Sequence, residues 1–298
     1  MVYHISALLG ESIEGLNIRP DGIYVDVTYG GGGHSAEILK HLTSGRLIAF
    51  DQDAEAERNV PDDNRILFIN QNFRFLANNL RYNGIEAIDG LLADLGVSFH
   101  QFDEPSRGFT FRQNAPLDMR MNRGNPVTAA QLLNTMDEES LAVIFYEYGE
   151  LPGARKIARR IIELRNEKPV ENVNDLMEAA GGLAPVRNPH KFYARLFQAL
   201  RIAVNQEITA LKEMLIQALA MLNSGGRLVV ITYHSLEDRL VKNFMKTGSF
   251  DGTIEKDFYG NTVIPFRLIT RKSITPAISE LAINNRARSA RLRIAEKI

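Results

Sequence analysis

The sequence predicts an α/β protein with a doubly wound, mostly parallel sheet and an inserted helical domain. Three observations predict it. Short apolar runs rich in β-branched residues alternate with helical patterns as far as Gly96, which is typical of parallel βαβ units. From residue 128 to about residue 180 the pattern is helical and contains no strand, and residues 181–189 read as a linker back to the sheet. A buried strand then returns at Arg227–Thr232, so the sheet resumes after the insert.

The individual elements follow from periodicity and from turn residues. The expected strands are Ile23–Val27, Leu47–Phe50, Ile66–Ile69, Ile88–Leu95 and Arg227–Thr232, followed by two closing strands within residues 262–270 and 289–295. The expected helices are Ile5–Leu9, Ser35–Leu42, Ala54–Arg58, Phe75–Tyr82, Ala129–Leu133, Glu138–Tyr148, Ala154–Arg165, Val173–Ala180, one long helix or two in sequence over Phe192–Leu222, and Leu236–Met245. Residues 97–127 show no period and predict a long loop region. We therefore expect a sheet domain in two parts, residues 1–104 and 191–298, around an inserted loop and helical domain at residues 105–190.

The composition is that of an ordinary globular protein, with 298 residues, 45% of them apolar and 24% charged. The sequence contains no cysteine, which excludes disulfides, thiolate metal sites and a cysteine nucleophile and fits a reducing cytoplasm. No apolar run reaches the ~18 residues of a membrane span, and no secretory signal is visible. The six histidines are scattered without metal-ligand spacing, so we expect no metal and a cytoplasmic protein.

A run of four glycines, Gly30–Gly33, lies between the first expected strand and the first helix of the sheet. Glycines let a ligand approach bare backbone, and a helix N-terminus, with Ser35 as its expected N-cap, favours an anionic group. Loose glycine patterns also occur at dinucleotide sites and at turns that bind nothing. Asp26 at the end of the preceding strand would repel a pyrophosphate but attract a cation. S-adenosylmethionine, which carries an ammonium and a sulfonium, fits this charge.

Further candidate residues follow other strands, at the edge where open α/β sheets bind ligands. Asp51 is placed to accept hydrogen bonds from ribose hydroxyls, while Asp53 fits the role of a helix N-cap better. Phe73 could stack on an adenine or pack in the core. Asp94 ends the fourth strand, and Gln101 lies in the loop that follows. His234-Ser235 ends the fifth strand and could also reach the site.

Charge is balanced overall, with a net charge of −1, so the whole chain gives no argument for a nucleic-acid partner. Locally, residues 151–170 hold six basic and two acidic residues, and basic residues also gather between Arg267 and Lys297. A solvated surface explains either run alone. Two such runs in one protein make a polyanionic substrate more attractive. Arg159, Arg160 and Arg288 are the candidate phosphate contacts.

Several longer motifs resemble those of the MraW-type family of bacterial methyltransferases, in order along nearly the whole chain. They are Gly32-Gly33-His34-Ser35, Asp94-Leu95-Gly96-Val97-Ser98, Arg107-Gly108-Phe109, Pro116-Leu117-Asp118-Met119-Arg120-Met121, Phe197-Gln198-Ala199-Leu200-Arg201-Ile202, His234-Ser235-Leu236-Glu237-Asp238-Arg239 and Arg286-Ala287-Arg288-Ser289-Ala290. The resemblance implies a class I S-adenosylmethionine-dependent methyltransferase fold, Rossmann-like, with a mostly parallel seven-stranded sheet and an inserted helical domain. It implies methyl transfer from S-adenosylmethionine to N4 of a cytidine in the decoding region of 16S ribosomal RNA, within the small subunit. It also implies that the cofactor is surrounded by Gly32, Gly33, His34, Asp51, Phe73, Asp94 and Gln101.

For such a reaction, Asp94 is the expected proton acceptor, although it could instead contact the cofactor. Phe109 or Phe111 is the expected stacking partner of a flipped or single-stranded base. A nicotinamide-dependent oxidoreductase is the main rival, against which Asp26 and the lack of a spaced glycine fingerprint count. A non-enzymatic RNA-binding assembly factor is the third possibility. The oligomeric state is not readable from the sequence.

Overall fold

The computed structural model describes residues 6–254 and 264–298. Packing divides the chain into two compact units, of which unit 1 is formed by the described residues of 1–96 and 209–298 and unit 2 by Val97–Ile208. The domain boundaries expected after residues 104 and 190 remain a prediction; by packing alone, residues 97–104 and 191–208 belong with the helices of unit 2. None of the helices in the described ranges is both long and apolar enough to span a membrane.

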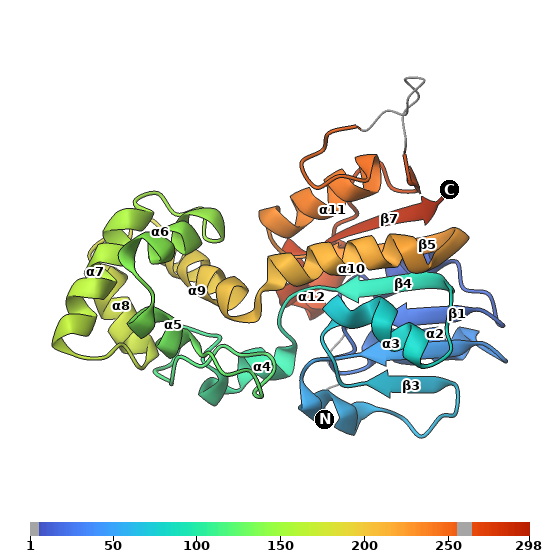
Figure 1. The fold of residues 1–298 in the computed structure, drawn as a ribbon, viewed down its shortest axis with the longest axis horizontal. Coiled ribbons are helices and arrows are strands. Elements are labelled where there is room, and N and C mark those ends of the chain that lie inside the picture. The colour runs from blue at the N-terminus through green and yellow to red at the C-terminus, as the bar shows by residue number, and fades with distance from the viewer. Residues whose placement is uncertain (1–5, 255–263) are drawn as a thin grey trace. The chain divides into compact units, whose positions relative to one another are not determined.

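Unit 1 contains, within the described residues, a seven-stranded sheet of order β3-β2-β1-β4-β5-β7-β6 (Figure 1). The first five strands of this order run parallel to one another, whereas β7 runs antiparallel to both β5 and β6. The strands are β1 (Ile23–Asp26), β2 (Arg46–Phe50), β3 (Ile66–Ile69), β4 (Ile88–Asp94), β5 (Leu222–Thr232), β6 (Phe266–Leu268) and β7 (Arg291–Lys297). This arrangement confirms the predicted Rossmann-like, mostly parallel sheet.

Helices cover both faces of the sheet, because neighbouring residues of each strand point to opposite sides. Val25, Leu91 and Val230 pack in one core with residues of α3 (Leu76–Tyr82), α10 (Glu207–Met221) and α11 (Ser235–Thr247). On the other face, Tyr24, Leu92 and Val229 pack with residues of α1 (Leu9–Leu16) and α2 (Gly33–His41). The strands are therefore buried on both faces, which explains their nearly continuous apolar runs. Short elements complete this unit: η1 (Ala54–Asn59), η2 (Phe73–Phe75), α12 (Ile278–Ile283) and η4 (Asn285–Ser289).

Unit 2 is helical within its described residues and has an apolar core of its own. Its elements are α4 (Phe99–Asp103), η3 (Pro105–Arg107), α5 (Ala129–Thr135), α6 (Glu138–Glu147), α7 (Ala154–Glu167), α8 (Val173–Gly181) and α9 (Pro189–Asn205). Three of the N-caps use side chains that suit this position: Thr128 and Asn172 form capping boxes, and Asp137 accepts from Ser140 N. The predicted helices of this region are therefore confirmed.

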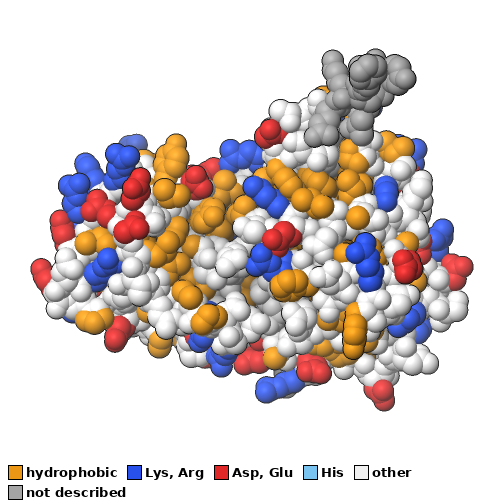
Figure 2. All heavy atoms as spheres, in the orientation of Figure 1, with side chains coloured by type: hydrophobic (Ala, Val, Ile, Leu, Met, Phe, Trp, Pro, Cys, Tyr) orange, Lys and Arg blue, Asp and Glu red, His pale blue; other side chains and the backbone are white. Residues whose placement is uncertain are grey.

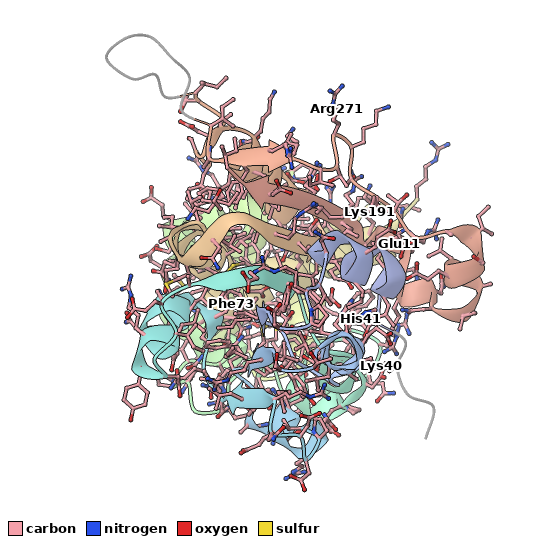
Figure 3. The ribbon with its side chains drawn as sticks, turned by 90° about the vertical axis from the view of Figure 1, so that its right-hand side faces the viewer. Glu11, Lys40, His41, Phe73, Lys191 and Arg271 are labelled. Carbon is pink, nitrogen blue, oxygen red and sulfur yellow. The ribbon has the colours of Figure 1, made fainter. Side chains whose placement is uncertain are left out.

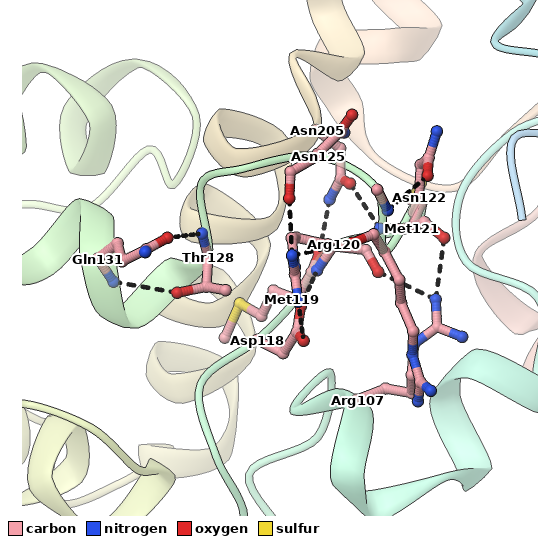
Figure 4. Close-up of polar contacts among 12 residues, drawn as sticks. Arg107, Asp118, Met119, Arg120, Met121, Asn122, Asn125, Thr128, Gln131 and Asn205 are labelled. Atoms are coloured by element: carbon pink, nitrogen blue, oxygen red, sulfur yellow. Dashed lines mark hydrogen bonds and ion pairs between the residues drawn. The ribbon is translucent and has the colours of Figure 1, made fainter.

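The long segment between α4 and α5 is ordered by buried polar contacts rather than by regular structure (Figure 4). The fully buried guanidinium of Arg107 donates to the carbonyl oxygens of Arg120 and Met121, at 3.0 and 2.9 Å. Asn205 on α9 donates to Met119 O and accepts from Met121 N, both at 2.7 Å. Each contact satisfies a backbone group that a loop of irregular shape cannot pair with itself. The absence of a sequence period here therefore does not mean disorder.

Several predicted boundaries are wrong, each for a local reason. The fifth strand begins at Leu222 rather than Arg227, because Leu222 pairs with Ile88 and the ladder resumes at Arg227 opposite Gly90 after a register shift. Residues 223–226 are thus part of an irregular strand. A helix was predicted at residues 5–9, but the first helix of the structure is α1, at Leu9–Leu16. Residue 5 of the predicted helix lies outside the described ranges. Residues 262 and 263 of the predicted closing strand also lie outside the described ranges.

The predicted segment Phe192–Leu222 forms two helices in sequence, which was one of the two expected arrangements. The break lies at Gln206, whose backbone is left-handed with φ of 51° and caps α9. The two predicted closing strands are present as β6 and β7, and they pair with each other in antiparallel orientation.

Candidate active site

Polar side chains gather at one edge of unit 1, where four neighbouring parallel strands end. Asp26 is the last residue of β1, and Asp51 follows β2 directly. Asp94 is the last residue of β4, and Tyr233 follows β5 directly. Because the carboxyl ends of parallel strands meet at one edge, the order β2-β1-β4-β5 places these side chains side by side. This edge is the candidate active site.

Asp26 forms buried hydrogen bonds that hold this edge of the sheet together. Its side chain is only 1% exposed, and its oxygens accept hydrogen bonds from Ser35 Oγ at 2.7 Å and from Thr28 N at 3.0 Å. The Thr28 hydroxyl in turn lies 2.6 Å from Asp94 N, so it links the ends of β1 and β4. The prediction that Ser35 caps the helix is wrong, because α2 already begins at Gly33 and the Ser35 hydroxyl is turned toward Asp26. Asp26 therefore supports the loop. It does not lie open to a ligand, although its predicted attraction of a cation implied that it would.

The glycine run makes the tight connection between β1 and α2. Gly30 and Gly32 have left-handed backbones, with φ of 52° and 78°, a conformation that favours glycine. A Cβ on Gly32 would lie 2.5 Å from Tyr29 Oη, and one on Gly33 would lie 2.1 Å from Ser6 Oγ. At Gly31, by contrast, a Cβ would meet nothing within 4 Å. The loop is thus packed against its own chain at Gly32 and Gly33 and leaves open space at Gly31.

The N-terminus of α2 follows this loop directly. The first bond of the helical i to i−4 type runs from Ala36 N to Gly32 O. The N–H groups of Gly33, His34 and Ser35 precede it, and such groups have no acceptor within their own helix. Together with the helix dipole they form a place where an anionic group is favoured.

Asp51 holds the other side of the loop. Its Oδ2 accepts from Gly30 N at 2.7 Å and its Oδ1 accepts from Asp53 N at 2.8 Å. Asp53 itself caps η1 by accepting from Glu55 N, which confirms the N-cap predicted for it. Each carboxylate oxygen can accept two hydrogen bonds, so Asp51 retains the capacity to accept one from a ligand hydroxyl.

Asp94 lies between a tyrosine and a histidine. Tyr233 Oη donates a hydrogen bond of 2.8 Å to Asp94 Oδ1, and His34 Nδ1 lies 3.8 Å from Asp94 Oδ2. The His34 ring is 5% exposed, and its Nε2 lies 3.1 Å from Ala7 O. Since a carbonyl oxygen only accepts, this contact assigns the Nε2 proton of His34. The Asp94 side chain retains an exposed fraction of 22%, so its carboxylate is partly open.

The three carboxyl groups share an environment that disfavours their charged forms. Burial is the largest cause of a raised pKa at each, to about 6 at both Asp51 and Asp94, and in the same direction at Asp26. The Asp26 charge further raises the pKa of both Asp51 and Asp94. A bound cation would relieve this repulsion, whereas a pyrophosphate would add to it. The electrostatics of the edge therefore favour a cationic ligand.

The remaining predicted site residues lie in environments that differ from one another. Phe73, labelled in Figure 3, opens η2 just after β3 and packs against the core that also contains residues of α3 and α10. This is the core-packing alternative, and a contact with adenine stays a prediction. Gln101 belongs to unit 2, where it is 4% exposed and its Oε1 accepts from Ser98 N at 3.2 Å. Its contact with a cofactor also stays a prediction. His234, which was expected to be able to reach the site, instead caps α11 by accepting from Glu237 N.

Tyr233 is the residue that the sequence analysis missed. Its position directly after a buried strand was the available signal, but His234-Ser235 attracted attention because their side chains have more familiar chemistry. The expectation that Phe109 is free to stack on a base is wrong, because its ring is 7% exposed in the core of unit 2. Phe111 packs against the rings of Tyr193 and Phe197, with centroids 5.9 and 5.6 Å away.

The three predicted phosphate contacts are exposed. Arg159 and Arg160 lie on α7 in unit 2, and Arg288 lies on η4 in unit 1. Arg159 Nε lies 3.6 Å from Glu138 Oε1 on α6, a weak surface ion pair. Basic and acidic side chains are mixed over α6 and α7 on the face that Figure 2 shows. Exposure fits a role in RNA binding, which stays a prediction.

Comparisons with known proteins agree with this picture. The family model described as the MraW methylase family matches residues 1–298. A protein of Parabacteroides distasonis named ribosomal RNA small subunit methyltransferase H is 56% identical, over 99% of this chain and 98% of that protein. A protein of the same name from Bacteroides thetaiotaomicron is 54% identical, over 100% of this chain and 98% of that protein. An rRNA methylase structure from Streptococcus thermophilus is only 14% identical, with a TM-score of 0.44 over 99% of both chains. The family assignment therefore depends on sequence similarity, and by that measure the chain belongs to the MraW methylase family.

Proposed function

We propose that this protein is an S-adenosylmethionine-dependent methyltransferase that modifies N4 of a cytidine in the decoding region of 16S ribosomal RNA. The observation that carries the proposal is the partly open Asp94 carboxylate, with its pKa raised to about 6, beside the glycine loop and the start of α2. The family membership and the names of the relatives support a small-subunit ribosomal RNA substrate. The motifs that resemble MraW-type enzymes support the cytidine N4 and the decoding region.

The residues of the site fit this cofactor. The helix dipole and the N–H groups at the start of α2 suit the carboxylate of its methionine part, and Asp51 suits its ribose hydroxyls. Gly31 leaves space in which a ligand can lie against bare backbone. The ammonium and the sulfonium suit an edge formed by three carboxyl groups. When bound, the cofactor supplies an electrophilic methyl group.

Asp94 is suited to serve as the general base. The lone pair of an exocyclic cytosine nitrogen is delocalised into the ring, so removal of an amino proton assists its attack on a methyl group. A carboxyl group with a pKa of about 6 is ionised at neutral pH and is a better proton acceptor than one with an ordinary pKa. The absence of cysteine removes the covalent route that methylation of a ring carbon uses, which supports a nitrogen target.

The test of the proposed function is transfer of a radiolabelled methyl group from S-adenosylmethionine to naked 16S ribosomal RNA, to assembled small subunits and to whole ribosomes. Mass analysis of the nucleosides is then expected to find N4-methylated cytidine in at least one of these substrates. A labelled product at another position would contradict the cytidine assignment. No transfer to any of them, although the cofactor binds, would contradict ribosomal RNA as the substrate.

We further propose that Arg159, Arg160 and Arg288 contact phosphates of the RNA. Replacing all three by Ala is expected to weaken RNA binding and to reduce the dependence of log Kd on log salt concentration by roughly two to three in slope, since each lost phosphate contact removes about 0.7 to 0.9. Binding titrations between low and high salt measure both quantities. The matched control is Arg81→Ala, which removes an exposed arginine from the last turn of α3. An unchanged affinity together with an unchanged slope would rule the three arginines out as phosphate contacts.

A further inference from the structure

Tyr233 lies in the candidate active site, but the reaction proposed above assigns it no role. It directly follows β5, and its backbone N–H donates to Glu237 Oε2 at 3.0 Å, in the first turn of α11. Its ring packs with the apolar core that contains Val229 and Ile231. The tyrosine is thus held both by its backbone and by its ring, and its hydroxyl points at Asp94 with a hydrogen bond of 2.8 Å. A side chain fixed in this way has little freedom left to lose in the reaction.

The two oxygens of Asp94 therefore differ. Among the described residues, Tyr233 is the one side chain that donates a hydrogen bond to this carboxylate, and it does so at Oδ1. Oδ2 faces His34 Nδ1 at 3.8 Å, which is too long for a hydrogen bond. Since the His34 Nε2 proton is directed at Ala7 O, the Nδ1 of a neutral ring has no proton to offer. Oδ2 is the oxygen that remains available to a substrate.

We propose that Tyr233 is a positioning residue for Asp94: its hydroxyl holds Oδ1 and stabilises the carboxylate, so that Oδ2 accepts the proton from the methyl-accepting nitrogen. This inference rests on the proposed function of Asp94 and adds to it a partner and an orientation. In the step, the nitrogen bonds the methyl carbon while the bond from that carbon to the sulfonium sulfur breaks, and the electron pair of the broken bond leaves on the sulfur. The amino N–H bond also breaks, its electron pair stays on the nitrogen, and the proton moves to Oδ2. The Tyr233 proton stays on the phenol.

The charges around the pair agree with this division of roles. Besides burial, the groups that act on Asp94 are His34 on α2, Tyr233, Asp26 at the end of β1 and Glu237 on α11. The Tyr233 hydrogen bond lowers the pKa of Asp94, as does His34 whenever its ring is charged, whereas Asp26 and Glu237 raise it. The pKa of Tyr233 itself is raised, by burial first and then by Asp94, so the phenol remains a donor throughout the neutral range. Removal of this hydroxyl alone would therefore raise the pKa of Asp94 further.

The test is Tyr233→Phe, which removes the hydroxyl and keeps the ring in the core. We expect kcat at pH 7 to fall about threefold to tenfold, as for the loss of one hydrogen bond of typical net strength. We also expect the acid limb of the profile of kcat against pH to move upward by about half a unit to one unit. A carbon-13 NMR titration of labelled aspartate carboxyl groups, with the Asp94 signal assigned by its absence in Asp94→Asn, is expected to move by the same amount.

The matched control is Tyr24→Phe, which removes the hydroxyl of another buried tyrosine at the opposite end of β1, where it accepts from Arg19 N. Circular dichroism and thermal unfolding are the checks that both variants are folded. The control is expected to leave the Asp94 titration and the pH profile where they are. An Asp94 signal that titrates identically in Tyr233→Phe and in the unmodified protein would overturn the inference. If the signal moves and the rate profile does not, the contact with Tyr233 stands and Asp94 is not the proton acceptor.

Discussion

Asp94→Asn is expected to lower kcat for methyl transfer by about 10²- to 10⁴-fold, the usual contribution of a general base. Asparagine has nearly the same shape and can still accept the hydrogen bond from Tyr233 Oη, so the end of β4 keeps its form. It cannot take a proton. Single-turnover rates with the RNA substrate measure the chemical step, and calorimetry with S-adenosylmethionine measures binding. We expect the dissociation constant to change by less than about tenfold, since only one charge-assisted contact is altered.

The matched control for this substitution lies on the same strand. Asp89 is in β4 at the opposite end of the sheet, where its carboxylate accepts from Ile23 N and pairs with Arg19. Asp89→Asn is expected to leave kcat within about threefold, because the side chain of Asp89 bonds to Ile23, Arg19 and Asn223, which lie outside the candidate site. If Asp94→Asn kept both normal affinity and near-normal turnover, Asp94 would not be the proton acceptor. A loss confined to cofactor affinity would assign Asp94 to binding instead.

Asp51→Ala is expected to weaken S-adenosylmethionine binding by about 10- to 100-fold. The reason is that losing a hydrogen bond to a carboxylate costs about 1.5 to 3 kcal/mol of binding free energy. The substitution removes the predicted partner of the ribose hydroxyls and also the acceptor of Gly30 N, which shapes the glycine loop. Asp62→Ala is the control, since Asp62 is an exposed acid in the same connection between β2 and β3. Calorimetry measures both variants, and equal affinities for them would contradict a role of Asp51 in cofactor binding.

The same site predicts how cofactor binding depends on pH. As the pH falls through about 6, Asp51 and Asp94 take up protons and the edge loses negative charge. S-adenosylmethionine carries one more positive charge than S-adenosylhomocysteine, because its sulfur is a sulfonium. The affinity for S-adenosylmethionine is therefore expected to fall more steeply between pH 7 and pH 5 than the affinity for S-adenosylhomocysteine. A ratio of the two affinities that stays constant over this range would show that the carboxylates do not select for the sulfonium.

Much of the fold was readable because local patterns and burial agree. Ile66–Ile69 was predicted with the bounds it has, since a run of four apolar residues between turn signals is too short for a typical helix. The helices of unit 2 were also found, because caps and periodicity coincide there. The break at Gln206 could only be left open, since no glycine or proline marks it.

The candidate site shows which of its features can be predicted from the sequence and which cannot. Asp26, Asp51 and Asp94 were identified because the ends of parallel strands meet, a rule that needs only strand order. Ser35 was misread as an N-cap because its partner, the Asp26 carboxylate, is nine residues away and not in the helix. Phe109 was misread as free because the core that buries it is assembled from helices far along the chain.

The sequence by itself determined the alternation of strands and helices, the glycine connection and the acids at the strand ends, because these follow from local periodicity and residue chemistry. Only the tertiary structure decided which acid lies beneath the loop and which lies open, since burial depends on what packs above each one. It also brought Tyr233 to Asp94 across 139 positions of the chain. A hydrogen bond between residues so far apart in sequence is specified by the pairing of β4 with β5, and no local pattern records it.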